Sequence, residues 1–173
     1  LNQSDYRDPH LVEVCNLERG ISLSVRNDAA FILDMSLNVY EHESTVCPNM
    51  PLRALIYVTN ILEQWVKGQN IYGRRLVKIP TPRFAVFYNG AEEQPERYPQ
   101  RLSDAFTNQM KKPKLELTCM VYNINSGKNR KLLTKCPVLK QYMVFVGYVR
   151  EELEMQPEKD LKEAIDKTID RCI

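Results

Sequence analysis

Hydrophobic and polar residues alternate in the first third of the chain. Residues 21–26 and 37–43 alternate with a period of two, and the apolar run 29–33 lies between them. A period of two sends successive side chains to opposite faces of a strand. The pattern therefore predicts a short antiparallel meander.

The spacing changes after Pro48, within the segment NMPLRALIYVTNILEQWVK. Six residues of this region fall on one helical face: Leu52, Leu55, Ile56, Thr59, Leu62 and Val66. This spacing predicts an amphipathic helix whose apolar face packs against the sheet.

Two further strands and then helices are expected in the second half. The segment FAVFYN at 84–89 lies between prolines and an Asn-Gly pair, as a buried strand commonly does, and residues 116–122 predict another strand. Between them, GAEEQPERYPQ at 90–100 has the composition of a surface loop. Helical spacing follows at about 128–154 and 157–173.

This order of elements predicts an α/β fold with a central mixed sheet flanked by helices. A chain of 173 residues with 43% hydrophobic content suits one domain over 1–173. The net charge of +2 argues against a highly basic nucleic-acid tail or a disordered acidic chain, and does not bear on local patches. Five scattered cysteines and two histidines favour a reducing compartment over a disulfide framework or zinc site. With no signal peptide or membrane-length apolar run, we expect a cytoplasmic protein without membrane contact.

Both ends of the sequence indicate a piece of a longer chain. The first residue is Leu1 rather than Met, and the apolar stripe within 157–173 continues almost to the last residue without a capping signal.

Four carboxylates occupy the hairpin region VRNDAAFILDMSLNVYEHEST. Glu41 and Glu43 share one strand face, about 7 Å apart. A turn at Met35-Ser36 would place Asp28 opposite Glu43, whereas a turn at Asp34-Met35 would place it opposite Glu41. Asp34 itself is expected to serve the turn.

Three carboxylates on one face repel one another unless they are solvated, protonated or bound to a cation. Oxygen ligands of this kind suit Mg²⁺ or Mn²⁺, and a metal there can activate water for phosphodiester hydrolysis. The alternative is the solvated face of an antiparallel sheet, where acidic residues are common.

Several blocks of the sequence carry a family resemblance. They are NDAAFILD, LNVYEHEST, PNMPLRALIYV, NIYGRRLVKIPTPRFAVFYNGAEEQPER, QRLSDAF and YNINSGKNRKLLTKC, and they extend from residue 27 to residue 136. These blocks resemble the recombination-promoting nuclease / transposase group of the PD-(D/E)xK superfamily, a set of bacterial proteins.

The resemblance implies a restriction-endonuclease-like core that binds a divalent metal and cuts DNA. Asp28 matches the Asp of the motif, Glu41 matches its Glu, and Glu43 matches the third position. Relatives carry Gln at that third position and the superfamily at large carries Lys. A Glu there can act as a base or as an extra metal ligand. By the same resemblance, the helix with Arg53 and Tyr57 follows the motif strand, and residues 84–89 match the next core strand.

A basic segment offers a surface for DNA phosphates. Residues 107–149 hold many lysines and arginines against a single acid, Glu116. The residues expected to contact DNA are Lys128, Arg130, Lys131 and Lys135. Arg74, Arg75 and Lys78 form a second, smaller cluster. Lysines on helix faces also serve solvation alone, which is the alternative interpretation.

The leading hypothesis is therefore a Mg²⁺- or Mn²⁺-dependent DNA endonuclease domain of a mobile-element or recombination protein. Asp28 and Glu41 would hold the metal, and Glu43 would orient or deprotonate water. Cutting both strands is most simply done by two sites, which favours a homodimer. The alternatives are a catalytically decayed PD-(D/E)xK domain that binds DNA or protein, and a purely structural or oligomerisation domain.

Overall fold

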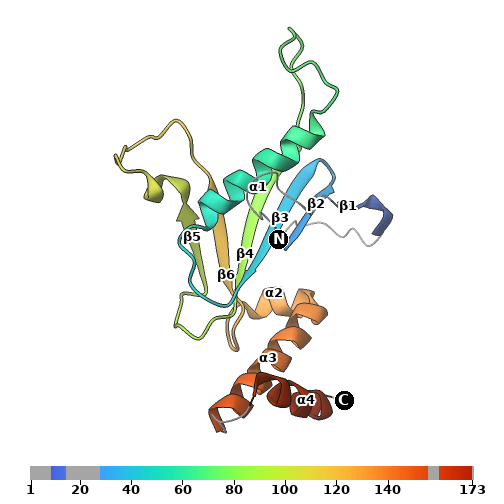
Figure 1. The fold of residues 1–173 in the computed structure, drawn as a ribbon, viewed down its shortest axis with the longest axis vertical. Helices are drawn as coiled ribbons and strands as arrows, with labels where there is room; N and C mark the ends of the chain where they lie inside the picture. The colour runs from blue at the N-terminus through green and yellow to red at the C-terminus, as the bar shows by residue number, and fades with distance from the viewer. Residues whose placement is uncertain (1–8, 15–27, 156–159, 173) are drawn as a thin grey trace. The chain divides into compact units, whose positions relative to one another are not determined.

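A computed structural model describes residues 9–14, 28–155 and 160–172 (Figure 1). The chain divides into two compact units, residues 1–122 and 123–173, which are described separately. The predicted strand at 21–26 lies outside the described residues. The prediction of one domain over 1–173 is not tested by this division, since a compact unit need not be a domain that folds separately.

The first unit contains a six-stranded mixed sheet with the order β1-β2-β3-β4-β6-β5. Its strands are β1 (Glu13–Val14), β2 (Ala29–Leu33), β3 (Ser36–Glu43), β4 (Thr81–Tyr88), β5 (Arg97–Arg101) and β6 (Thr118–Asn123). β2 pairs antiparallel with both β1 and β3, and β5 with β6, whereas β3 and β4 are parallel. This arrangement confirms the predicted α/β class with a mixed sheet.

A two-residue turn at Asp34-Met35 joins β2 to β3. Leu33 pairs with Ser36 and Ala29 with Tyr40, which selects this turn over the one at Met35-Ser36. Asp34 and Met35 have φ angles of 47° and 53°. Left-handed conformation at both positions matches the twist of a hairpin, so the turn role of Asp34 is confirmed.

Helix α1 (Met50–Trp65) lies between β3 and β4 in the sequence and packs on one face of the sheet (Figure 1). The helix agrees with the prediction, but its core-facing side does not. Its buried residues are Met50, Pro51, Ala54, Tyr57, Val58 and Ile61. On the predicted face, by contrast, Leu52 is 44% exposed and Ile56 is 36% exposed. Two apolar stripes have nearly equal spacing, and packing selects the one in which the small Ala54 meets the sheet.

The main core lies between α1 and this face of the sheet. Its largest fully buried members on the strands are Leu37, Val39, Tyr88 and Val121. They pack with the α1 residues, so the position of the helix is fixed by apolar burial on both sides.

Strand β5 corrects the prediction of a surface loop over 90–100. Residues 97–101 pair antiparallel with β6 at the end of the strand order. Pro99 concealed the strand in the sequence, because proline cannot donate to a sheet ladder. An edge strand tolerates this residue, since one side of it needs no partner.

Short 3₁₀ segments, η1 (Pro9–Leu11) and η2 (Leu102–Ala105), complete the described part of the first unit. The second unit contains α2 (Arg130–Lys135), α3 (Pro137–Met155) and α4 (Leu161–Cys172). The helix predicted over 128–154 is thus two helices, because Pro137 cannot continue the hydrogen bonding of α2.

An ion pair links the two longer helices of this unit. Lys167 Nζ lies 2.8 Å from Glu152 Oε2, which joins α4 to α3. Within the described ranges, none of the helices has the length and apolar character needed to cross a bilayer.

Candidate active site

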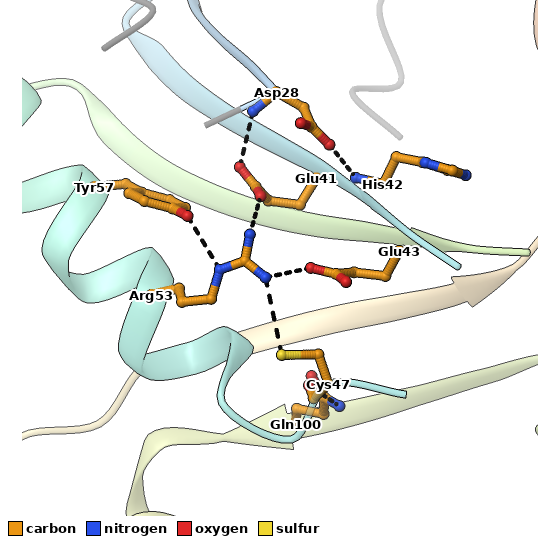
Figure 2. A network of polar contacts seen from close by, with 8 residues as sticks. All are labelled: Asp28, Glu41, His42, Glu43, Cys47, Arg53, Tyr57 and Gln100. Atoms are coloured by element: carbon orange, nitrogen blue, oxygen red, sulfur yellow. Dashed lines mark hydrogen bonds and ion pairs between the residues drawn. The ribbon is translucent and has the colours of Figure 1, made fainter. Parts of the chain in front are cut away.

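The structure brings the three carboxylates predicted from the sequence to one end of the β2–β3 hairpin (Figure 2). Asp28 immediately precedes β2, and the β2–β3 register, continued by one residue, places it opposite Glu41. The backbone N–H of Asp28 donates to Glu41 Oε1 at 3.1 Å. In return, the backbone N–H of His42 donates to Asp28 Oδ2 at 2.7 Å. Glu43, two residues beyond Glu41, projects from the same face of β3.

A fourth residue, Arg53 of α1, lies among these carboxylates (Figure 2). Its Nη2 donates to Glu41 Oε2 at 3.0 Å, and its Nη1 donates to Glu43 Oε1. Its Nε donates to Tyr57 Oη at 3.1 Å, one helical turn further along. One guanidinium therefore connects both carboxylates of β3 to the helix.

Sequence reasoning placed Arg53 on the correct helix but gave it no role in the site. One signal was present, because residues four apart lie on the same face of a helix, and Arg53 and Tyr57 have this spacing. The direction of that face was decided by the packing of α1 on the sheet. A neighbouring thiol is also close, with Arg53 Nη1 3.9 Å from Cys47 Sγ.

Burial dominates the electrostatics of Glu41, whose residue is 3% exposed. Desolvation raises the pKa of this carboxyl to about 7, and the charges of Asp28 and Glu43 act in the same direction. The backbone N–H of Asp28 and the guanidinium of Arg53 offset only part of that rise. The carboxyl of Glu41 is consequently balanced between its neutral and ionised forms near neutral pH.

Arg53 remains charged in the same environment. Burial acts against its positive charge, but hydrogen bonds to Tyr57 and Cys47 and the Glu43 carboxylate leave its pKa raised. Burial raises the pKa of the Tyr57 hydroxyl, so this group stays neutral and accepts a hydrogen bond from Arg53 Nε.

The donor chemistry fits a divalent metal held by two side chains rather than three. Asp28 and Glu41 are cross-strand neighbours whose carboxylates each accept a backbone N–H, and Mg²⁺ in proteins commonly uses one or two carboxylates together with water and phosphate oxygens. Among the described residues, no group of three or more acidic, histidine or cysteine side chains is placed to hold a metal ion. Arg53 pairs with both Glu41 and Glu43.

The basic residues expected to contact DNA belong to the second unit. Lys128 precedes α2, while Arg130, Lys131 and Lys135 lie on α2. Arg130 also lines a cavity of about 540 Å³ together with Lys140 and Tyr148. The contact of these residues with DNA stays a prediction.

Comparison with known proteins gives no relative: no protein-family model, curated protein or solved structure matches this chain.

Proposed function

We propose that this chain is a metal-dependent DNA endonuclease domain with a restriction-endonuclease-like core of the PD-(D/E)xK type. The observation that carries the proposal is the nearly complete burial of the Glu41 carboxylate directly beside Asp28. Burying a carboxylate is costly unless charge or hydrogen bonds compensate for it. One guanidinium among three carboxylates leaves an excess of negative charge, which a bound cation would offset.

The order of the elements adds support. An Asp before one strand and a Glu-x-Glu sequence on its antiparallel neighbour are followed by α1 and then by a strand parallel to the second one. This is the order in which the family resemblance places its motif strand, helix and next core strand. A bacterial, cytoplasmic setting in recombination or mobile-element activity belongs to the same proposal.

Asp28 and Glu41 would hold Mg²⁺ or Mn²⁺, which when bound supplies Lewis-acid activation of the phosphodiester and of water. Glu41 must be ionised for this task. Arg53 favours that form through its 3.0 Å contact and holds the carboxylate in place. Glu43 would orient a water molecule with the oxygen that does not receive the Arg53 hydrogen bond. It would take a proton from that water as the water oxygen bonds to phosphorus and the P–O bond to the leaving group breaks, and the leaving oxygen would take a proton from solvent.

The experiment is incubation of the 173-residue chain with supercoiled plasmid in Mg²⁺ or Mn²⁺. We expect nicking that EDTA abolishes and that Asp28→Asn and Glu41→Gln each reduce by about 100-fold or more. Glu63→Gln, at an exposed position of α1, is the matched control and should cleave like the parent chain. Cleavage that survives in either site variant, with the fold intact, would refute the assignment.

One observation favours a second candidate, a decayed PD-(D/E)xK domain that binds DNA or protein. Arg53 forks between Glu41 and Glu43, so a protein cation already neutralises part of the carboxylate cluster. In a decayed domain these contacts of Arg53 would stabilise the fold and have no part in catalysis. Metal titration followed by calorimetry separates the two: Mn²⁺ binding that Asp28→Asn removes supports the nuclease, whereas no binding by a folded chain supports the decayed module.

A further inference from the structure

The connection between α1 and β4 projects as a loop beyond the end of the helix (Figure 1). It is defined as the 67–79 loop. Four large apolar side chains in it are exposed: Ile71 (52%), Tyr72 (94%), Leu76 (74%) and Ile79 (47%). Single exposed apolar residues are ordinary, but four within nine positions indicate a surface that meets a partner.

All the charges of this loop are positive. Four exposed residues carry these charges, and none of them has an ion pair within the described parts of the chain: Lys67, Arg74, Arg75 and Lys78. The sequence contains no acidic residue between Gln64 and Ala91. The loop is therefore a local concentration of cations in a chain whose net charge is only +2.

Local hydrogen bonds hold the tip of the loop. Asn70 Oδ1 accepts the backbone N–H of Tyr72 at 3.2 Å, and Asn70 O accepts that of Gly73 at 3.2 Å. At the base, the N–H of Thr81 donates to Met35 O at 2.8 Å. The backbone around Tyr72 is thus held by local hydrogen bonds, which lowers the entropy cost of ordering this part of the loop on binding.

We propose that the 67–79 loop is a DNA-contacting element in which the cations bind phosphates and the Tyr72 ring stacks on an unpaired base. An exposed aromatic face with surrounding arginines and lysines is the chemistry by which single-stranded nucleic acid is bound. The inference rests on the proposed function for the choice of DNA as the partner.

The spacing between the loop and the carboxylates suits one DNA molecule. From Arg53 to Trp65, α1 advances about 18 Å at 1.5 Å per residue. That length corresponds to about five base pairs at 3.4 Å each. A strand cut at Glu41 can therefore extend to the loop, which would act in holding the substrate rather than in the chemistry.

The test measures binding in EDTA, so that cleavage plays no part. Fluorescence anisotropy of the 173-residue chain with a labelled single-stranded oligonucleotide and with its duplex gives the affinity at several salt concentrations. The charge variant is Arg74→Ser/Arg75→Ser/Lys78→Ser. Its matched control is Arg83→Ser/Arg97→Ser/Arg101→Ser, which removes the same charge from exposed positions of the same unit that lie outside both the loop and the basic segment 107–149.

We expect the charge variant to bind both DNAs more weakly and to lower the duplex salt slope by about 0.9 for each phosphate that the loop no longer neutralises. Tyr72→Ala should weaken single-strand binding by roughly 5- to 100-fold without changing the duplex salt slope. Tyr72→Phe keeps an aromatic ring and should bind the single strand as the parent chain does. An equal loss of affinity in the arginine control, or no effect of Tyr72→Ala, would overturn the inference. So would a loop variant that no longer binds phosphatidylserine vesicles while its DNA binding is unchanged.

Failure of this inference is distinguishable from failure of the proposed nuclease. If the parent chain never cleaves DNA but the loop variants bind DNA more weakly, the nuclease proposal is refuted and the loop inference is supported. If the loop variants bind and cleave DNA as the parent does, the loop inference is refuted and the nuclease proposal is supported.

Discussion

The guanidinium of Arg53 lies 3.0 Å from the carboxylate of Glu41, and the two side chains are 37% and 3% exposed. One partner is thus buried at the end of β3 while the other reaches it from α1. Because the buried member is the acid, its protonation and the presence of the arginine are thermodynamically linked.

Replacing Arg53 by Gln should destabilise the protein in a pH-dependent way. Removing one partner of a buried pair leaves the other uncompensated, and the partial exposure of Arg53 limits the loss to about 1–3 kcal/mol at pH 8. At pH 5 the carboxyl of Glu41, with its pKa of about 7, is protonated, and the loss should be smaller. Urea unfolding followed by the fluorescence of Trp65, the single tryptophan, measures both values.

Arg74→Gln is the control for the Arg53 prediction, since it removes a guanidinium from an exposed loop position. Its effect should stay within about 0.5 kcal/mol at either pH. If Arg53→Gln reduced the stability as much at pH 5 as at pH 8, the link between this arginine and Glu41 would be wrong.

The raised pKa of Glu41 predicts that this residue makes folding less favourable as pH increases. The folded state holds the proton up to about pH 7, whereas the unfolded carboxyl releases it near 4.5. Between these values the folded state binds more protons, so the free energy of unfolding falls with rising pH, by on the order of 3 kcal/mol in total. Above about pH 7 this contribution is constant.

Glu41→Gln should remove that part of the pH dependence, because glutamine does not titrate. The measurement is the difference in unfolding free energy between the parent and the variant at several pH values from 4 to 8. We expect the difference to shift in favour of the variant as pH rises through the window. A difference that is independent of pH would contradict the assignment.

Met35→Gly should stabilise the hairpin. Met35 has a φ of 53° and its side chain is 52% exposed, so the change relieves left-handed strain and costs little packing. After allowance for the greater freedom of glycine in the unfolded chain, we expect a gain of about 0.5–1 kcal/mol in urea unfolding. Met35→Ala keeps the strained φ and should give no gain, so equal effects of the two changes would exclude this explanation.

Two glycine substitutions should act in opposite directions. A Cβ at Gly90 would overlap with Ser44 O and with the ring and hydroxyl of Tyr88. Gly90→Ala should therefore cost about 1–3 kcal/mol. At Gly147 in α3 a Cβ meets no atom within 4 Å, so Gly147→Ala should gain about 0.5–1 kcal/mol from helix propensity. Thermal or urea unfolding of both variants checks the signs, and equal signs would refute the packing argument.

Features that depend on local backbone geometry could be predicted from the residues alone. Alternation along 37–43 placed Glu41 and Glu43 on one face, because the two-residue period of a strand is independent of its neighbours. The existence of α1 followed in the same way from helical spacing. For Asp28 the sequence allowed two turns that place it on the face of Glu41 and Glu43, and an odd-length loop or a bulge that would move it to the other face.

Packing between elements that are distant in the chain sets which turn forms, which face of α1 is buried and which cation meets the carboxylates. A helix with two apolar stripes can turn either one inward, and the fit against the sheet selects between them. That selection brings Arg53 to Glu41, twelve residues earlier in the chain. The pKa of Glu41 was equally inaccessible from sequence, since desolvation depends on every side chain packed around the carboxyl.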